Sequence, residues 1–416
     1  MKTIAEKILS MKSGRDVRAG DTVVCTVDWV LGTDASSPMA IDYFRQMGGD
    51  RVVNPDRVLF AMDHYSPPST AKTAAFHEEI RVFARRFGTR LREVGDGISF
   101  QILSEELAAP GDLVIGADSH TVTCGALNLF ATGVGSSDLA AAMLTGQTWL
   151  RVPDSIKVTI TGARPRGVAA KDVALTLVAE LGPEGASYQA LEFHGDGLPA
   201  LTLEDRLVIS NLAVEMDAKA SIFPLDEAAL AYLGARPPRA ISAVSADPGA
   251  RYSREIAVDL STVSPRVALP HAPDNVVPIE RAAGTPIQMV FIGTCTGGRV
   301  PDFHEALAIL EAGGGRLAPG LQLVITPASR EVQLRLLEDG TLRKLAAMGA
   351  VITTPGCGAC CGTSGAIPAD GMNVLSTANR NFKARMGNAT ASIYLASPAA
   401  CAAAALTGRI TDPRPH

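Results

Sequence analysis

Short apolar, β-branched runs alternate with helical stretches along almost the whole chain. This alternation is typical of parallel sheets that are covered by helices on both faces, so the sequence predicts an α/β fold. The predicted strands cover residues 22–27, 58–62, 113–115, 156–160, 288–292, 321–325 and 351–353.

Serine residues mark the starts of several predicted helices. A serine precedes a proline at residues 37–38 and 397–398, so each hydroxyl is expected to cap a helix whose first position is the proline. Ser136 is expected to cap a helix that continues through Leu150. Charged residues interrupt the apolar ones in residues 1–12, which predicts an amphipathic helix and no signal peptide.

Two proline-containing stretches, residues 151–154 and 264–274, are typical of joints between domains. A chain of 416 residues is long enough for two or three domains of roughly 150 residues each. The joints predict three α/β domains with mainly parallel sheets, which cover residues 1–153, 154–270 and 271–416.

Composition and charge exclude several classes of protein. Hydrophobic residues make up 47% of the chain and charged residues 19%, which indicates a globular protein and excludes a disordered chain. The net charge is −5 and the basic residues are scattered, which disfavours nucleic acids and anionic membranes as partners. Seven cysteines without a visible export signal favour a cytoplasmic protein without disulfides, so a metal or redox role has to be considered for them.

Residues with reactive side chains gather just past the ends of four predicted strands. They are Asp63 with His64, residues 118–120, Cys295 and Cys357. Open parallel sheets place their ligand crevices at the carboxyl ends of their strands. Residues that are far apart in the sequence are therefore expected to form one site.

The cysteines by themselves leave several interpretations open. Cys357 and Cys360 form a C-x-x-C pair among glycines, which is compatible with half a zinc site, a redox pair or two buried thiols. Cys295 adds a third thiol on another glycine turn. A structural zinc normally has four protein ligands, and Cys361 is adjacent to Cys360, so its side chain should point elsewhere. A four-iron cluster on three cysteines would leave one iron with an open coordination position.

Eight motifs occur in order along the chain: D-H at 63–64, G-A-D-S-H-T at 116–121, A-T-G-V-G-S-S-D at 131–138, I-S-N-L-A-V-E at 209–215, F-I-G-T-C-T-G-G-R at 291–299, G-C-G-A-C-C-G at 356–362, N-R-N-F-K-A-R-M-G at 379–387 and Y-L-A-S-P at 394–398. With these motifs the chain resembles, nearly end to end, the large subunits of the aconitase superfamily. The resemblance is strongest to the 3-isopropylmalate dehydratase and homoaconitase type.

The resemblance implies a cofactor and a partner. It implies that Cys295, Cys357 and Cys360 hold a [4Fe-4S] cluster, and that three α/β domains surround this cluster. In the family a fourth, swivelling domain closes over the cluster and supplies a serine base. That domain is not expected within this chain, so a small subunit is the expected partner and the large chain alone is expected to be inactive.

The resemblance also implies a substrate clamp. Arg380 and Arg385, with Asn379, match the family's substrate-contacting positions. A guanidinium fork binds a carboxylate through two parallel hydrogen bonds. Without the family pattern, the same arginines would be read as part of an exposed basic loop.

Acid–base roles are implied for several further residues. His64 is expected to handle the proton of the departing hydroxyl and to be held by Asp63, and Asp118 with His120 matches a second acid–base element. Asn211 and Glu215 match a pair of residues near the open iron. Two positions beyond Glu215, Asp217 replaces the glycine that is usual in the family.

The implied activity is that of a hydro-lyase. It isomerises a 2-hydroxy di- or tricarboxylic acid by dehydration and rehydration, and the closest match is the 3-isopropylmalate dehydratase of leucine biosynthesis. One alternative is a specialised paralogue that acts on dimethylmalate, citramalate or a secondary-metabolism analogue. Two others are a non-catalytic, cluster-binding regulatory protein and a zinc-stabilised structural protein.

Three further residues depart from the family pattern. Phe100 replaces a histidine, Gly297 replaces an asparagine, and Ala384 replaces a glycine. Phe100 is expected to matter most, because a phenyl ring neither carries a proton nor satisfies the carboxylate of Asp118. It predicts weak activity on 3-isopropylmalate and better activity on another alkylmalate.

Overall fold

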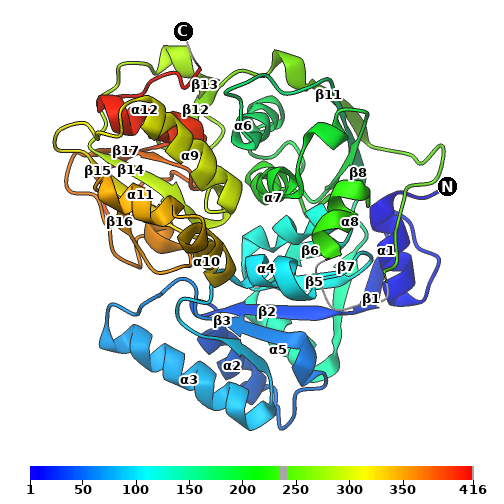
Figure 1. Ribbon diagram of the computed structural model, residues 1–416. Helices are drawn as coiled ribbons and strands as arrows, with labels where there is room; N and C mark the ends of the chain where they lie inside the picture. The colour runs from blue at the N-terminus through cyan, green and yellow to red at the C-terminus, as the bar shows by residue number, and fades with distance from the viewer. Residues whose placement is uncertain (235–240, 415–416) are drawn as a thin grey trace.

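The computed structural model describes residues 1–234 and 241–414. Three mainly parallel sheets, each flanked by helices, surround the centre of the molecule, where α4 (Ser99–Ile102) and α7 (Leu203–Leu212) lie (Figure 1). The predicted α/β architecture is confirmed. No helix within the described residues is both long and apolar enough to span a membrane.

The first sheet has five parallel strands in the order β4-β3-β2-β5-β6. Its strands are β2 (Trp29–Thr33), β3 (Val58–Ala61), β4 (Arg90–Arg92), β5 (Leu113–Gly116) and β6 (Phe130–Gly133). Its helices are α2 (Ser37–Gln46), α3 (Ala71–Phe87) and α5 (Ser136–Thr145), which lie at the bottom of Figure 1.

The second sheet has four parallel strands in the order β10-β9-β8-β11. Its strands are β8 (Ser155–Thr161), β9 (Ala190–His194), β10 (Ala220–Ile222) and β11 (Arg254–Asp259). Two further helices accompany α7 in this part of the chain: α6 (Ala170–Leu181) and α8 (Glu227–Leu233).

The third sheet has seven strands in the order β13-β12-β18-β17-β14-β15-β16, of which β12 runs antiparallel to both its neighbours. Its strands are β12 (Arg266–Ala268), β13 (Val276–Pro278), β14 (Met289–Gly293), β15 (Gln322–Thr326), β16 (Val351–Ile352), β17 (Asn373–Ser376) and β18 (Ser392–Leu395). Its helices are α9 (Val300–Ala312), α10 (Arg330–Glu338), α11 (Thr341–Ala347) and α12 (Pro398–Thr407).

A two-stranded antiparallel ribbon joins β1 (Thr22–Thr26) to β7 (Gln147–Arg151), next to α1 (Ile4–Ser13). The prediction of one helix from Ser136 through Leu150 is wrong. That helix ends at Thr145, because Gly146 adopts a left-handed conformation with φ of 70° and turns the chain into β7.

One of the three predicted serine caps is confirmed, and two are wrong. Ser397 caps α12, since its side chain accepts a hydrogen bond from the backbone of Ala400. Ser37 and Ser136 are instead the first residues of their helices, and the preceding cap residues, Ser36 and Gly135, make no side-chain cap hydrogen bond.

The strand orders place the candidate residues together. In the first sheet β2 lies between β3 and β5, so later strands are added on both sides of it. In the third sheet β14 lies in the same way between β15 and β17. A parallel sheet opens a crevice at such a switch point, outside the carboxyl ends of its strands. The residues that follow these strands therefore meet at the centre of the molecule.

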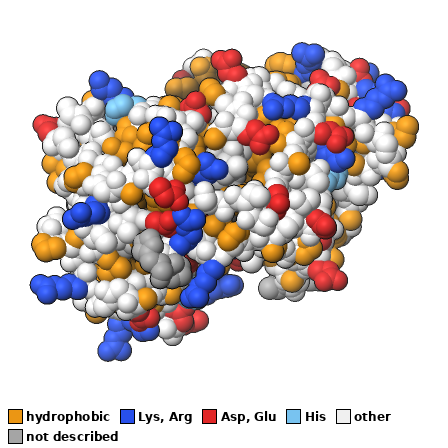
Figure 2. Space-filling view, turned by 90° about the horizontal axis from the view of Figure 1, so that it is seen from above, with side chains coloured by type: hydrophobic (Ala, Val, Ile, Leu, Met, Phe, Trp, Pro, Cys, Tyr) orange, Lys and Arg blue, Asp and Glu red, His pale blue; other side chains and the backbone are white. Residues whose placement is uncertain are grey.

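The surface does not gather charge of one sign on the face seen in Figure 2. Lysine and arginine side chains are interspersed there with aspartate and glutamate. This mixed distribution agrees with the scattered basic residues of the sequence.

Candidate functional site

The turn after β3 holds an imidazole against a buried carboxylate. The carboxylate oxygen Oδ1 of Asp63 lies 2.7 Å from Nδ1 of His64, and Oδ2 accepts a hydrogen bond from the backbone nitrogen of Ser99 at 2.9 Å. Asp63 is fully buried, whereas His64 is partly exposed. Asp63 therefore orients the His64 ring, whose other nitrogen, Nε2, lies 3.8 Å from Asp118.

A second buried carboxylate, Asp34, supports this turn. Asp34 directly follows β2 and accepts hydrogen bonds from the backbone nitrogens of His64 and Tyr65, each at 2.9 Å. Its Oδ2 also lies 2.8 Å from Nε2 of His77. Sequence reasoning missed Asp34 because it missed the strand at residues 29–33, whose carboxyl end carries it.

The environment of His64 favours its charged form. Burial by itself would lower the pKa of His64, but its contacts with Cys357 and with the carboxylate of Asp63 raise it well above its ordinary value. Burial raises the pKa of Asp63, although the contact with His64 opposes this shift. The pair can thus hold a proton at the mouth of the crevice.

A second chain of acid–base groups starts at the end of β5. His120 lies between two carboxylates, since Nδ1 is 3.4 Å from Asp118 and Nε2 is 2.9 Å from Oε1 of Glu215. The same oxygen of Glu215 accepts a hydrogen bond from Nε of Arg380 at 2.8 Å. Burial would raise the pKa values of both carboxyls, but His120 holds them below their usual ranges, with help from His64 at Asp118 and from Arg380 at Glu215.

Two buried thiols contact the amide group of Asn379, and a third lies beside His64. The Nδ2 of Asn379 donates to Sγ of Cys295 at 3.3 Å, and its Oδ1 lies 3.7 Å from Sγ of Cys360. The third sulfur, of Cys357, lies 3.8 Å from Nδ1 of His64. All three cysteines are at most 8% exposed.

Glycine makes the close approach of the cysteine loop possible. Gly358 has φ of 56°, and a Cβ atom there would lie 2.4 Å from Oγ1 of Thr326. The backbone nitrogen of Cys357 donates to the carbonyl of Asp63 at 2.9 Å. The loop after β16 is thereby joined to the turn after β3.

The donor set fits a metal–sulfur group. The three sulfurs do not lie within 4.8 Å of one another as a set, whereas cysteines on a single tetrahedral zinc are about 3.8 Å apart. Cys361 turns away, to within 2.8 Å of the hydroxyl of Thr363. A group larger than one ion, held by three sulfurs, therefore fits this arrangement better than a structural zinc.

Charge supports the same conclusion. Arg385 donates to Sγ of Cys360 at 3.5 Å, and its buried Nε has no hydrogen-bond partner among the described residues. Burial raises the pKa of the Cys295 thiol to about 11 and that of Cys357 well above its ordinary value. Thiols in this state lose their protons when a metal binds, and the nearby guanidinium stabilises the resulting negative charge.

The remaining predicted residue joins the same network. Asn211, at the end of α7, accepts a hydrogen bond from Nδ2 of Asn379 at 3.1 Å and donates to Thr123 at 2.8 Å. Contacts link the residues predicted from the sequence in two sets: Asp63, His64, Asp118, His120, Glu215, Arg380 and Cys357 in one, and Asn211, Asn379, Cys295, Cys360 and Arg385 in the other. Thr123 joins the two sets, because its hydroxyl donates to the carbonyl of His120 at 2.6 Å and accepts the hydrogen bond from Asn211. The chemical roles of the predicted residues stay predictions.

Known proteins resemble the chain over its whole length. A profile of the Aconitase family (aconitate hydratase) matches residues 6–408. The 3-isopropylmalate dehydratase large subunit 1 of Thermotoga maritima is 46% identical over 416 residues, which cover 99% of each chain. The large subunit 1 of Methanopyrus kandleri is 43% identical over 417 residues, which cover 100% of this chain and 99% of that protein. This chain belongs to the aconitase family.

A solved structure of the aconitase family shares the fold. The holo-form of aconitase X from Thermococcus kodakaraensis superposes with a TM-score of 0.55 at 14% identity, covering 91% of this chain and 88% of that one. The predicted family, the aconitase-like α/β fold and the hydro-lyase class are confirmed by these comparisons.

This aconitase-family chain accommodates its departures in different ways. Gly297 packs directly on Thr377, since a Cβ atom there would lie 2.3 Å from that side chain. Ala384 and Asp217, where the family has glycine, adopt the left-handed conformation that glycine favours, with φ of 66° and 62°. The expectation that Phe100 leaves Asp118 unsatisfied is wrong, because the backbone of His120 donates to this carboxylate at 2.8 Å.

A hollow opens beside Asp118. Its volume is about 550 Å³, and its lining includes Ser119, Asp138, Trp149, Tyr188 and Lys219. Of the acid–base residues of this aconitase-family site, Asp118 lines the hollow.

Proposed function

We propose that this chain is the large subunit of a [4Fe-4S] hydro-lyase, with Cys295, Cys357 and Cys360 as the cluster ligands. Its substrate is a 2-hydroxy di- or tricarboxylic acid, and 3-isopropylmalate is the acid we favour because full-length relatives carry that name. One observation carries the proposal: the three thiols share a single site with two acid–base pairs and two arginines.

The two arginines suit the carboxylates of the substrate. Arg385 lies against Cys360, and Arg380 directly follows Asn379, whose amide contacts Cys295. Arg380 already donates a hydrogen bond to the carboxylate of Glu215. A guanidinium group of this kind also binds a substrate carboxylate well. Substrate carboxylates bound here would orient the acid with its hydroxyl toward the cysteines.

The protein's own residues then handle protons. His64, charged and held by Asp63, is placed to donate a proton from Nε2 to the departing hydroxyl. Asp118, His120 and Glu215 form the second path, by which a proton reaches or leaves the solvent-filled hollow. When bound, a cluster on three cysteines supplies an iron with an open position, which acts as a Lewis acid.

The proposal includes a partner subunit. The relatives are named large subunits, so a small subunit that carries the swivelling domain and the serine base is the implied partner. The complex would work in the cytoplasm, in leucine biosynthesis. Purified large chain is expected to show no hydro-lyase activity until a small subunit of the isopropylmalate dehydratase type is added.

The cysteines provide the decisive test. Serine at Cys295, Cys357 or Cys360 is expected to abolish the broad visible absorption and the content of about four irons of protein purified without oxygen. The matched control is Cys361→Ser, which should keep both, because Cys361 faces Thr363. Loss of the absorption in Cys361→Ser, or its retention in any of the other three variants, would contradict the ligand assignment.

A second candidate function rests on Phe100. If the family's histidine carries a proton at this position, a phenyl ring there favours another alkylmalate, such as dimethylmalate or citramalate. The two candidates are separated by assaying the reconstituted enzyme on both acids. A non-catalytic regulatory protein would bind the cluster and turn over neither.

A further inference from the structure

Lys171 is a buried lysine in the first turn of α6, an unfavourable place for a positive charge. It is the second residue of α6, where its positive charge faces the positive end of the helix dipole, and it is only 1% exposed. Burial lowers its pKa to about 8. The local helix therefore gives no reason for a lysine here, and the reason must lie in what its ammonium contacts.

The ammonium donates to two backbone carbonyls from a distant part of the chain. Nζ of Lys171 donates to the carbonyl of Thr377 at 2.9 Å and to that of Ala378 at 2.6 Å. The same carbonyl of Thr377 accepts a hydrogen bond from the hydroxyl of Thr296 at 2.6 Å. Lys171 thus joins α6 to the turn that carries Cys295 and to the segment after β17.

The two carbonyls directly precede the substrate clamp. Asn379 contacts Cys295 and Asn211, and Arg380 contacts Glu215. A rotation of either peptide group before Asn379 would move both side chains. The last backbone hydrogen bond from this segment to β14 runs from the nitrogen of Thr377 to the carbonyl of Phe291, at 3.0 Å, so side-chain donors hold the two carbonyls that follow it.

We propose that Lys171 is a positioning residue of this site. Its ammonium holds the peptide groups of Thr377 and Ala378, and thereby sets where Asn379 and Arg380 stand relative to Cys295. The consequence for the substrate, a carboxylic acid bound by Arg380, rests on the proposed function. The positioning itself does not.

Amide hydrogen exchange tests the positioning without any substrate. Lys171→Met keeps the apolar stem and removes the ammonium, so residues 377–387 are expected to exchange about tenfold faster or more, while the rest of the chain exchanges as in wild type. Lys157→Met is the matched control, since Lys157 lies partly exposed on β8, pairs with Glu255 at 3.5 Å and lies 5.9 Å from the ring centroid of Tyr252. Lys171→Arg keeps the charge on a differently shaped head and should lie between wild type and Lys171→Met.

Kinetics of the enzyme reconstituted with its small subunit give the second measurement. Lys171→Met should raise KM more than it lowers kcat, with a combined loss of about 10²-fold in kcat/KM, because a displaced clamp binds the carboxylate less well. A purely structural role would reduce the amount of active protein and leave KM unchanged.

The outcomes separate this proposal from the proposed function. Wild-type exchange in residues 377–387, or equally faster exchange throughout the chain, overturns the role of Lys171. If Lys171→Met does not fold, Lys171→Arg decides by the same comparison with wild type. Local exchange as expected in an enzyme whose wild type converts no hydroxy acid would instead refute the proposed function and leave the positioning role intact.

Discussion

Phe100 is an apolar residue in a backbone segment that serves the site. Its neighbour Ser99 donates its backbone nitrogen to Asp63, and its other neighbour Gln101 accepts a hydrogen bond from Nε of Arg299 at 3.0 Å. The Phe100 ring itself is 2% exposed and belongs to a large apolar cluster. At this position the backbone supports the site while the ring contributes to the core.

Phe100→His is expected to lower stability without raising activity. Asp118 already has His120 and His64 as partners, so the new imidazole would lie among apolar side chains without a required contact. An unsatisfied buried polar group costs about 1–3 kcal/mol. The free energy of unfolding in urea should fall by about that amount, and the rate on 3-isopropylmalate should not increase.

Phe100→Leu is the control for loss of the ring, because it keeps the site apolar. A clear gain in rate on 3-isopropylmalate for Phe100→His, but not for Phe100→Leu, would contradict this expectation. That result would favour the specialised paralogue, in which the wild-type phenyl ring has replaced a proton-carrying group.

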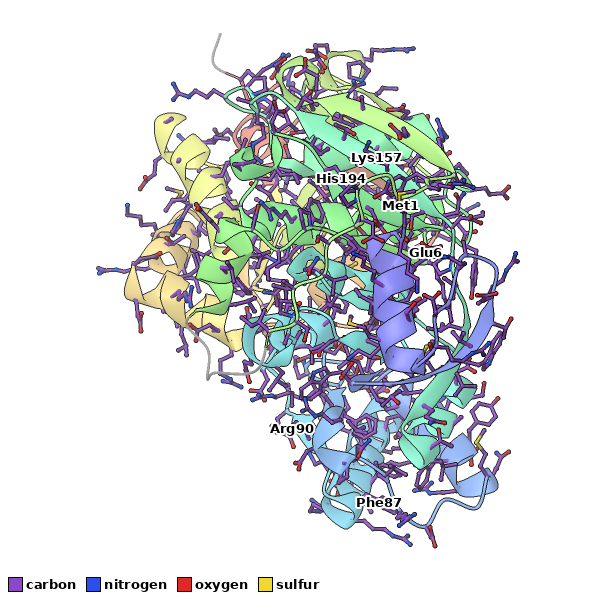
Figure 3. The ribbon with its side chains drawn as sticks, turned by 90° about the vertical axis from the view of Figure 1, so that its right-hand side faces the viewer. Met1, Glu6, Phe87, Arg90, Lys157 and His194 are labelled. Atoms are coloured by element: carbon purple, nitrogen blue, oxygen red, sulfur yellow. The ribbon has the colours of Figure 1, made fainter. Side chains whose placement is uncertain are left out.

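Among the elements, α1 is held by a residue from another part of the chain. Glu192 on β9 accepts hydrogen bonds from the backbone nitrogens of Ile4 and Ala5, at 3.0 and 2.9 Å, and from the hydroxyl of Ser155 at 3.0 Å. These nitrogens belong to the first turn of α1, where a helix has no internal acceptors. Figure 3 shows Met1 at the start of α1 just below His194, which ends β9.

Glu192→Ala is expected to lower the free energy of unfolding by about 3 kcal/mol, because it leaves several buried donors without an acceptor. Urea unfolding measures the change. Glu255→Ala, on β11 of the same sheet, is the matched control. The exposed ion pair of Glu255 with Lys157 contributes less than about 1 kcal/mol to the free energy of unfolding. Equal effects of the two substitutions would contradict a capping role for Glu192.

The division into three domains stays a prediction, and its boundaries can be compared with the residues that form each sheet. Each large sheet is built from one continuous stretch of chain. However, β12 pairs with β18 of the third sheet although it lies before the predicted boundary at residue 271. We propose that the second boundary falls near Ser264, just before β12, rather than after it.

At the scale of the whole molecule, partly buried acids lie between the second and third parts. Glu305 and Asp302 of α9 line a hollow of about 200 Å³ together with Lys171 of α6. Burial raises the pKa of Glu305 to about 7, and the neighbouring charges of Asp302 and Asp172 add to this shift. The charged form of Glu305 is therefore unfavourable in the folded protein.

This shift predicts a stability that falls as the pH rises. The folded-state pKa of Glu305 lies above its ordinary value of 4.5, so the unfolded chain loses the proton first and stability decreases between pH 4.5 and about 7. Glu305→Gln removes the charge. Its advantage over wild type in free energy of unfolding should grow by about 2 kcal/mol from pH 5 to pH 8.

Glu338→Gln, on the exposed surface of α10, is the control for the change of net charge. Its difference from wild type should stay nearly constant over the same pH range. An advantage of Glu305→Gln that is equally large at pH 5 and pH 8 would show that its effect does not come from the proton.

The sequence alone determined the features that depend on local pattern. The candidate residues Asp63, Asp118 and Cys295 could be placed at a common edge, because each follows a recognisable strand and parallel strands share their carboxyl ends. Residues 147–150 were assigned to the preceding helix because their pattern is compatible with either element. Only the pairing of these residues with β1 makes them a strand.

The tertiary structure alone decided which side chains support the site. Asp34 bonds His77 across 43 positions, and Lys171 reaches Thr377 across 206 positions, so no local pattern connects either pair. Such contacts arise when a helix packs on its own sheet, as for Asp34 and His77, or when separate parts of the fold pack together, as for Lys171 and Thr377. This packing brings buried polar groups to partners that sequence spacing does not encode. The motifs therefore predicted the candidate residues of the site, whereas the groups that hold these residues in place could be identified only from the folded structure.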